Sequence, residues 1–367
     1  MGSDEREGKL IVETEDGLYV PEGDFHIDPW RPVARAVVTH AHSDHATPGS
    51  GAYITSKSGA GVLALRVGTK SPIEPMEYGA VQTVGNVRVS LHPAGHILGS
   101  SQVRVERLTK SAMGPAGEVA VFSGDYKVAA EGEAAGADRT CAAFEVVRCH
   151  TFITESTFGV PIYRWKPQRS VFEEINAWWA GNAANGVTSV IFSYALGKSQ
   201  RLLMGVDPGI GPIACHGHVM RFDAAYRAEG VELPSVVHAN VETAKELRGR
   251  ALVIATPSVQ GTAWLDRWTK GREGISCASA SGWMMVRGAR RRGSVDRGFV
   301  LSDHADWGGL LRTIDATGAE RVGVTHGPAA TLVRYLNETR GSKGLRAFVV
   351  STRYVSEPED GAGGVEA

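Results

Sequence analysis

The chain has 367 residues, which is long enough for two domains or for one large core with an insertion. Hydrophobic residues make up 43% and charged residues 22%, as is ordinary for a soluble globular protein. The formal net charge of -1 excludes a general attraction to polyanions, so nucleic-acid binding would need a local basic patch.

The cysteines and the N-terminus indicate a cellular compartment. No Cys-x-x-Cys pair occurs among Cys141, Cys149, Cys215 and Cys277, so we expect neither a disulfide framework nor a cysteine zinc site. Residues 1–9 are polar and do not resemble a signal peptide. No apolar run approaches the roughly 18 residues that span a membrane. We therefore expect a cytoplasmic protein with no membrane partner.

Three apolar runs in the first part of the chain have the length of strands. They are residues 34–39, 118–123 and 146–154, and each ends on a polar cluster: a histidine-rich run, Asp125 and Glu155. Open α/β sheets present active sites at the carboxyl ends of their strands in this way.

The middle of the chain predicts a second α/β unit. Ser170 and Glu173 have the spacing of a capping box, and apolar residues follow at helical intervals. Residues 189–193 read as a strand, and residues 197–199 as a turn that opens a helix. A basic stretch at residues 282–298 precedes two short apolar runs, 299–301 and 322–325, which end on further histidines. The Gly- and Glu-rich final dozen residues predict a frayed tail.

The densest chemical signal is His40-Ala41-His42-Ser43-Asp44-His45. Imidazole and carboxylate groups suit zinc, manganese and similar ions. Alternate residues of a turn can point to one side, so His40 and His42 can bind one ion while Asp44 and His45 face a second. The alternative is a polar surface loop that is rich in histidine.

This run resembles the HxHxDH signature of the metallo-β-lactamase superfamily. Three further motifs of that superfamily follow its order: Asp28 resembles the first acidic motif, His96 in Ala-Gly-His-Ile-Leu-Gly-Ser the third, and Asp125 in Ser-Gly-Asp the fourth.

Other motifs resemble the β-CASP branch of the superfamily, whose members process nucleic acids. Glu155 is similar to motif A, His304 to motif B and His326 to motif C, while residues 280–284 resemble the Ser-Gly-Met loop. The resemblance covers residues 17–350 and is nearest to the bacterial ligase-associated DNA exonucleases, relatives of Artemis and the cross-link-repair nucleases.

The resemblance implies a role for each motif residue. His40, His42 and His96 would hold one ion, Asp44, His45 and His326 a second, and Asp125 would bridge them. Two divalent ions about 3.5–4 Å apart, zinc or manganese here, can clamp a phosphodiester and lower the pKa of a shared water. His304 would act as general acid, and Glu155 and Asp28 would orient histidines from behind.

The resemblance also implies a fold. We expect a four-layer αβ/βα metallo-β-lactamase sandwich with an inserted α/β β-CASP domain. The first domain would comprise residues 1–159 and 300–355, the insertion residues 160–299 and the flexible tail residues 356–367.

Candidate substrate contacts lie mainly in the expected insertion. Ser279, Ser281 and Gly282 could form a phosphate nest, and Lys198 precedes a helix where anion sites often form. The arginine run, Arg287, Arg290, Arg291, Arg292 and Arg297, could follow a phosphate backbone or be a solvated loop. Trp283 could stack on a base or pack internally. We expect no metal at His216 and His218, which have no acidic partner nearby.

Three functions remain open, and the first is a two-metal DNA exonuclease, acting from a 5′ end in DNA repair. A ribonuclease is favoured by His326, because DNA-acting members of the branch often lack histidine at motif C. The third is a non-catalytic nucleic-acid-binding module, against which the intact ligand set argues. A small-molecule hydrolase would not need the β-CASP motifs. Association with a DNA ligase or helicase is implied by the resemblance alone.

Overall fold

The computed structural model describes residues 9–269, 274–286 and 295–352, and these form two units. The first unit contains residues 9–128, Cys141–Arg164 and residues 304–352. The second contains Ala129–Thr140 and residues 165–303, so it includes a segment that precedes the expected insertion. Within the described part of the chain, no helix is both long and apolar enough to cross a membrane.

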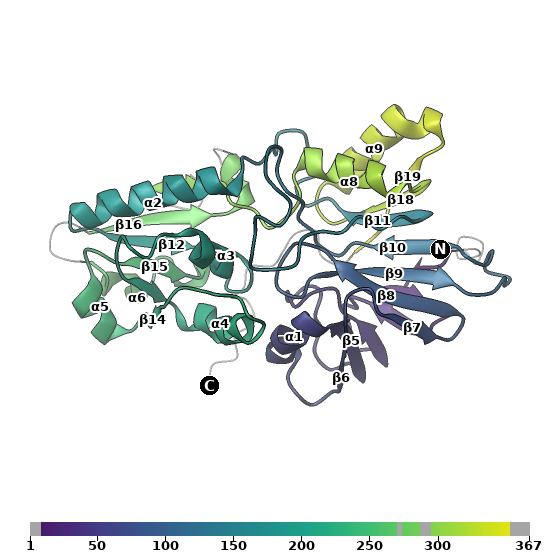
Figure 1. The fold of residues 1–367 in the computed structure, drawn as a ribbon, viewed down its shortest axis with the longest axis horizontal. Coiled ribbons are helices and arrows are strands. Elements are labelled where there is room, and N and C mark those ends of the chain that lie inside the picture. Colours follow the sequence, from purple (N-terminus) through teal and green to yellow (C-terminus); the bar gives the residue numbers. More distant parts are fainter. Residues whose placement is uncertain (1–8, 270–273, 287–294, 353–367) are drawn as a thin grey trace. The chain divides into compact units, whose positions relative to one another are not determined.

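The first unit begins with a six-stranded sheet, shown in purple and dark blue in Figure 1. Its strands lie in chain order: β1 (Val12–Glu13), β2 (Leu18–Val20), β3 (Phe25–Ile27), β4 (Arg35–Val37), β5 (Ala52–Ser56) and β6 (Ile73–Met76). Strands β1 to β3 form an antiparallel meander, and β3 to β6 are parallel. The short helix α1 (Ala60–Val67) contacts β5 and β6.

A second sheet of the same unit has the order β19-β18-β11-β10-β9-β8-β7. Its strands are β7 (Val81–Val84), β8 (Val87–Pro93), β9 (Ser101–Arg107), β10 (Val119–Phe122), β11 (Thr151–Glu155), β18 (Arg321–Thr325) and β19 (Arg346–Val349). Strands β10, β11, β18 and β19 are parallel. Strand β9 is antiparallel to both β8 and β10, so β8 runs in the same direction as β10.

The alternation of residues along β10 shows how the layers of this unit are held together. Ala120 and Phe122 join a core shared with the first sheet, whereas Val119 and Val121 join a second core. Successive strand side chains point to opposite faces, so each face of this buried sheet has its own apolar partner. The partner on the second face is the helix pair α8 (Trp307–Thr317) and α9 (Ala329–Arg340).

The second unit is built on a six-stranded parallel sheet of order β14-β13-β15-β12-β16-β17. The strands are β12 (Thr188–Phe192), β13 (Ile213–Cys215), β14 (Val237–His238), β15 (Leu252–Ala255), β16 (Ile275–Ala280) and β17 (Arg297–Phe299). In Figure 1, α2 (Gln168–Ala184) lies along one face, and α5 (Val241–Leu247) and α6 (Ala263–Asp266) along the other. Helices α3 (Lys198–Gly205) and α4 (Gly217–Ala228) follow β12 and β13.

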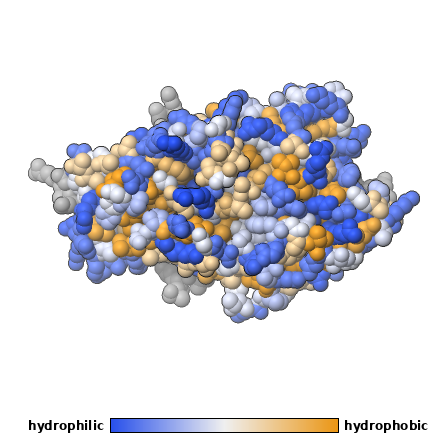
Figure 2. Space-filling view, viewed as in Figure 1, coloured by the Kyte–Doolittle hydropathy of each residue, from blue (hydrophilic) through white to orange (hydrophobic). Residues whose placement is uncertain are grey.

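The mixed hydropathy of the surface is consistent with two units that each bury an apolar core of their own. On the face seen in Figure 2, hydrophilic and hydrophobic residues are interspersed.

The sequence-predicted strands 34–39, 118–123, 146–154 and 189–193 are confirmed as β4, β10, β11 and β12, each shifted by a few residues at its ends.

The predicted capping box at Ser170 is wrong. Helix α2 begins two residues earlier, at Gln168 after Pro167, and its N-cap makes no side-chain hydrogen bond. The Glu133 carboxylate accepts the Gln168 backbone N–H at 3.1 Å instead. A carboxylate from a distant segment therefore satisfies the helix end that the local pattern assigned to Ser170.

Gly79 and Gly99 of the first unit both have a positive φ, but only Gly99 packs closely against another backbone segment. Gly99, three residues after His96, has φ +74°, and a Cβ there would lie 2.1 Å from the Gly59 Cα. Gly79 has nearly the same φ, +75°, but nothing lies within 4 Å of its Cβ position. The Ser56 hydroxyl also donates to the Gly99 carbonyl at 2.5 Å.

We expect Gly79→Ala to cost about 1–2 kcal/mol, the ordinary cost of a left-handed alanine. Gly99→Ala should cost at least about 2 kcal/mol more, because backbone must move to make room. Chemical denaturation of both variants measures the difference. Equal losses would show that strain alone, and not the contact with Gly59, requires glycine at position 99.

Candidate metal centre

The directions of the strands bring the histidines and carboxylates of the first unit together. Strands β8, β10, β11 and β18 run the same way, so their carboxyl ends lie at one edge of the sheet. His96 follows β8, Asp125 follows β10, Glu155 ends β11 and His326 follows β18. Strand β4 of the other sheet leads into His40.

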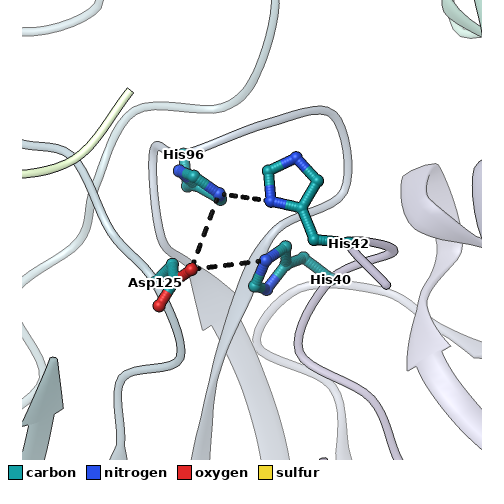
Figure 3. A group of neighbouring side chains, drawn as sticks. All are labelled: His40, His42, His96 and Asp125. Carbon is teal, nitrogen blue, oxygen red and sulfur yellow. Dashed lines mark hydrogen bonds and ion pairs between the residues drawn. The ribbon is translucent and has the colours of Figure 1, made fainter. Parts of the chain in front are cut away.

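The first cluster consists of His40, His42, His96 and Asp125, all buried, with ligand atoms within 4.8 Å of one another (Figure 3). His96 Nε2 lies 3.1 Å from His42 Nδ1. The Asp125 Oδ2 atom lies 3.6 Å from His40 Nε2 and 3.9 Å from His96 Nε2. The three imidazoles thus surround one carboxylate.

A second cluster consists of Asp44, His45 and His326. His45 Nε2 lies 3.6 Å from Asp44 Oδ2, and the rings of His45 and His326 stack at 5.1 Å between centroids. The same His45 nitrogen lies 3.4 Å from Asp125 Oδ2. The Asp125 carboxylate is therefore shared by the two clusters.

The chemistry of these side chains fits metal ions. His40 Nε2 and Asp125 Oδ1 are buried and have no hydrogen-bond partner. A buried polar atom without a partner costs about 1–3 kcal/mol, and a cation placed among these groups would remove that cost. Imidazole nitrogens with carboxylate oxygens are a donor set that suits divalent transition metals. These buried clusters could hold metal ions.

The pKa shifts of His40 and Asp125 also favour metal binding. Burial lowers the pKa of His40 well below its usual value, and the neighbouring imidazoles lower it further. Burial alone would raise the pKa of Asp125, but His45 and other imidazoles outweigh it and hold that pKa well below the usual range. His40 is therefore neutral and Asp125 ionised near pH 7, the forms that bind metal.

The protonation of His45 differs from that of His40. Burial opposes the charged form of His45, but three neighbouring carboxylates outweigh burial and raise its pKa well above the usual value. They belong to Asp125, Asp44 and Asp28. A proton on His45 would compete with an ion, so occupancy of this cluster should fall as pH falls.

Asp28 lies behind His45. Its Oδ2 atom lies 2.7 Å from His45 Nδ1, and its two oxygens accept from the Thr39 backbone N–H at 2.7 Å and hydroxyl at 2.5 Å. The other nitrogen of His45, Nε2, then faces Asp44 and Asp125. Sequence reasoning missed Thr39, although its place directly before His40 was a signal.

Glu155 and His304 form a buried pair beside the clusters. His304 Nδ1 lies 3.0 and 2.9 Å from the two Glu155 carboxylate oxygens. The Tyr126 backbone N–H donates to Glu155 Oε1 at 2.7 Å, and the Ala305 N–H donates to the Tyr126 carbonyl at 2.7 Å. Sequence reasoning missed Tyr126, whose backbone thus fixes both members of the pair.

The residues of the second unit that were expected to contact substrate lie in different settings, and one of them, Lys198, contacts other side chains of the protein. Lys198 is buried, with its Nζ atom 3.0 Å from Asp303 Oδ1 and over the Tyr194 ring. Ser279 lies within β16, and Ser281 and Gly282 begin the 3-10 turn η4 (Gly282–Met285). Arg287, Arg290, Arg291 and Arg292 lie outside the described residues, and Arg297 begins the edge strand β17.

His216 and His218 belong to the second unit. The His216 ring caps α4 by accepting the His218 backbone N–H, and it contacts the Trp264 ring at 5.3 Å. Burial, together with the nearby His218, lowers the pKa of His216 to about 4. Among the described residues, no group of candidate metal ligands includes either histidine.

No model of a known protein family matches the chain. A "Probable DNA ligase" from Opitutus terrae is 32% identical over 340 residues, which are 92% of this chain and 31% of that protein. "Endoribonuclease ysh-1" from Neurospora crassa is 28% identical over 138 residues, 37% of this chain and 14% of that protein. "Endoribonuclease YSH1" from Gibberella zeae is 29% identical over 140 residues, with the same shares. The chain thus spans less than a third of the length of these relatives.

A solved structure shows a related fold. The crystal structure of a protein of unknown function from Enterococcus faecalis matches with a TM-score of 0.51 and 11% identity. The match covers 79% of this chain and 74% of that one. The sequence relatives confirm the resemblance to β-CASP nucleases of the metallo-β-lactamase superfamily.

The role of Asp28 gives a test. We expect Asp28→Asn to lower the metal affinity of the His45 cluster about 10- to 100-fold, because a carboxylate no longer orients the imidazole. Asp28 has φ +43°, which asparagine tolerates, so the fold should survive. Titration of the metal-free chain with zinc or manganese measures the affinity.

Asp24→Asn is the matched control. Asp24 also has a positive φ, 51°, but it is exposed and accepts from the Tyr19 hydroxyl at 2.8 Å. Its substitution should leave metal affinity unchanged. An unchanged affinity in Asp28→Asn as well would remove Asp28 from the metal centre.

Proposed function

Because the chain resembles the β-CASP nucleases, we propose that it is a two-metal-ion phosphodiesterase that acts on nucleic acid. More narrowly, we propose a DNA exonuclease that acts from the 5′ end in DNA repair. The observation that carries the proposal is the pair of buried His/Asp clusters joined by the Asp125 carboxylate. A non-catalytic binding module would not need so many ligand groups around one carboxylate.

We assign the ligands by cluster. His40, His42 and His96 would hold one ion, Asp44, His45 and His326 the other, and Asp125 would contact both. The donor set suits zinc or manganese. When bound, two such ions would polarise the phosphate and lower the pKa of a bound water molecule.

His304 is the candidate general acid. Its Nδ1 lies against the Glu155 carboxylate, so its Nε2 is the nitrogen that can give a proton to the leaving oxygen. Glu155 would stabilise the charged imidazolium and hold its orientation. Glu155 is the last residue of β11 and also accepts from the Tyr126 backbone, so both the sheet and the segment after β10 hold its carboxylate.

The layers support the assignment of domains. Two sheets that share a core, with helices packed on the second sheet, fit the αβ/βα metallo-β-lactamase sandwich for the first unit. The parallel sheet of the second unit would be the β-CASP domain, and Ser279, Ser281 and Gly282, at the end of β16 and the start of η4, would take a backbone phosphate.

A ribonuclease is the second candidate, and two observations favour it. His326 stacks on His45 and completes a second cluster, and two relatives are named endoribonucleases. The relative that matches 92% of the chain is named a probable DNA ligase, which favours DNA and a role beside ligation. We place this activity in the cytoplasm, with a DNA ligase or helicase as candidate partner.

The two candidates separate in one assay. We expect 5′-phosphorylated single-stranded DNA to be degraded faster than RNA of the same sequence, with mononucleotides released from the 5′ end. The reaction contains manganese or zinc, and Asp44→Ala is the inactive control. Faster cutting of RNA would favour the ribonuclease, and no cutting of either strand by metal-loaded protein would contradict both.

His304→Ala tests the proposed acid. The turnover rate should fall about 10²- to 10⁴-fold, because the leaving oxygen loses its proton donor. Metal content, measured by mass spectrometry, should not change. Glu155→Gln should lower turnover in the same direction while His304 remains in place. Normal cutting by His304→Ala would show that another group supplies the proton.

A further inference from the structure

We propose that Trp283 is a stacking platform for an unpaired base of the nucleic-acid substrate. The inference rests on the proposed function and adds a substrate requirement to it, namely a single strand with an intact base. Trp283 lies in the second unit, on η4 directly after β16.

The position of Trp283 in the sheet is the first argument. All strand pairs of this sheet are parallel, so the residues that follow β12, β15 and β16 lie at one edge. These residues begin with Ser193, Thr256 and Ser281. Ligands of parallel α/β sheets bind outside the carboxyl ends of the strands. Trp283 therefore lies where this class of sheet receives its ligand.

The construction of the turn is the second argument. The Ser281 N–H donates to the Phe299 carbonyl at 3.1 Å, and the Ser281 hydroxyl accepts the Trp283 N–H at 3.3 Å. The Met284 N–H donates back to the Ser281 carbonyl at 3.1 Å. Gly282 and Met284, on either side of Trp283, are buried. The turn is fixed at both sides of the indole, so the backbone of the platform is already ordered.

Exposure is the third argument. Trp283 is 38% exposed, whereas its neighbours Gly282 and Met284 are buried. The other large hydrophobic residues that the described structure exposes are aliphatic, namely Val81, Val146, Ile162, Val237, Val241 and Val349. An aliphatic side chain offers only apolar area, but an indole also offers a flat π face. More than a third of the Trp283 side chain is therefore open to solvent, at the carboxyl edge of the parallel sheet.

Base stacking matches this chemistry. Every base has a π face, so an indole binds bases with little sequence preference. In a duplex both faces of a base are already stacked, so the platform requires an unpaired base. A protein with a net charge of -1 has no general attraction to phosphates, which increases the share of affinity that stacking must supply.

The first test measures binding of a fluorescein-labelled single-stranded DNA to the full chain in the presence of EDTA. We expect Trp283→Ala and Trp283→Met to weaken binding on the order of ten-fold, and Trp283→Phe to keep most of the affinity. The methionine variant keeps apolar area without a ring, and the phenylalanine variant keeps the ring. Val237→Ala, at an equally exposed position on β14 (40%), is the control and should not change the affinity.

The second test moves a single abasic nucleotide along the oligonucleotide. At the stacked position, wild type and Trp283→Ala should bind equally, because the base that distinguishes them is missing. Elsewhere the roughly ten-fold difference should persist. A difference that persists at every abasic position, or Trp283→Ala and Trp283→Met that bind like wild type, would overturn the platform.

The outcomes separate this inference from the proposed function. If wild type neither binds nor cuts single strands, both fall. If wild type binds and cuts, and the ring-free variants match it, only the role of Trp283 falls.

Discussion

The Asp125 carboxylate is the group around which the first unit is organised. Its Oδ2 atom lies within 4 Å of nitrogens from His40, His45 and His96, and all four side chains are buried. Without a cation, this arrangement leaves polar atoms buried and unpartnered, which folded proteins avoid. A cation could supply the missing partners, and the strands that surround Asp125 hold these groups close to one another.

The shared direction of four strands brings these groups to one place. Because β9 reverses between β8 and β10, four strands end at the same edge, and their ends carry His96, Asp125, Glu155 and His326. His96 and Asp125 each lie three residues after a strand, Glu155 ends β11, and His326 directly follows β18. The arrangement explains why residues far apart in the chain form one centre without a long loop, and why Asp28 and Glu155, one step behind, can orient the imidazoles.

Much of this centre could be predicted from the sequence, because the motif residues follow short apolar strands and four of them lie within His40–His45. The residues that hold these side chains in place were harder to predict. Thr39 and Tyr126 act partly or wholly through backbone N–H groups, which nearly every residue provides. Lys198 was predicted to lie at an anion site, and its partner in the structure, Asp303, lies far along the chain and was not predicted. The Ser170 capping box failed for the same reason, since Glu133 comes from another segment. Local patterns find ligands that are close in sequence, and they do not reveal which distant group will satisfy a charge.

The order of the ligands along the chain has a consequence for biosynthesis. His40, His42, His96 and Asp125 all precede the second unit, whereas His326 follows it. During translation the first cluster is therefore complete in sequence roughly 200 residues before the second. At about 5–20 residues per second, this delay is on the order of 10–40 s. A nascent chain thus carries every group of the first cluster well before it carries His326, so the two clusters become complete at different stages of synthesis.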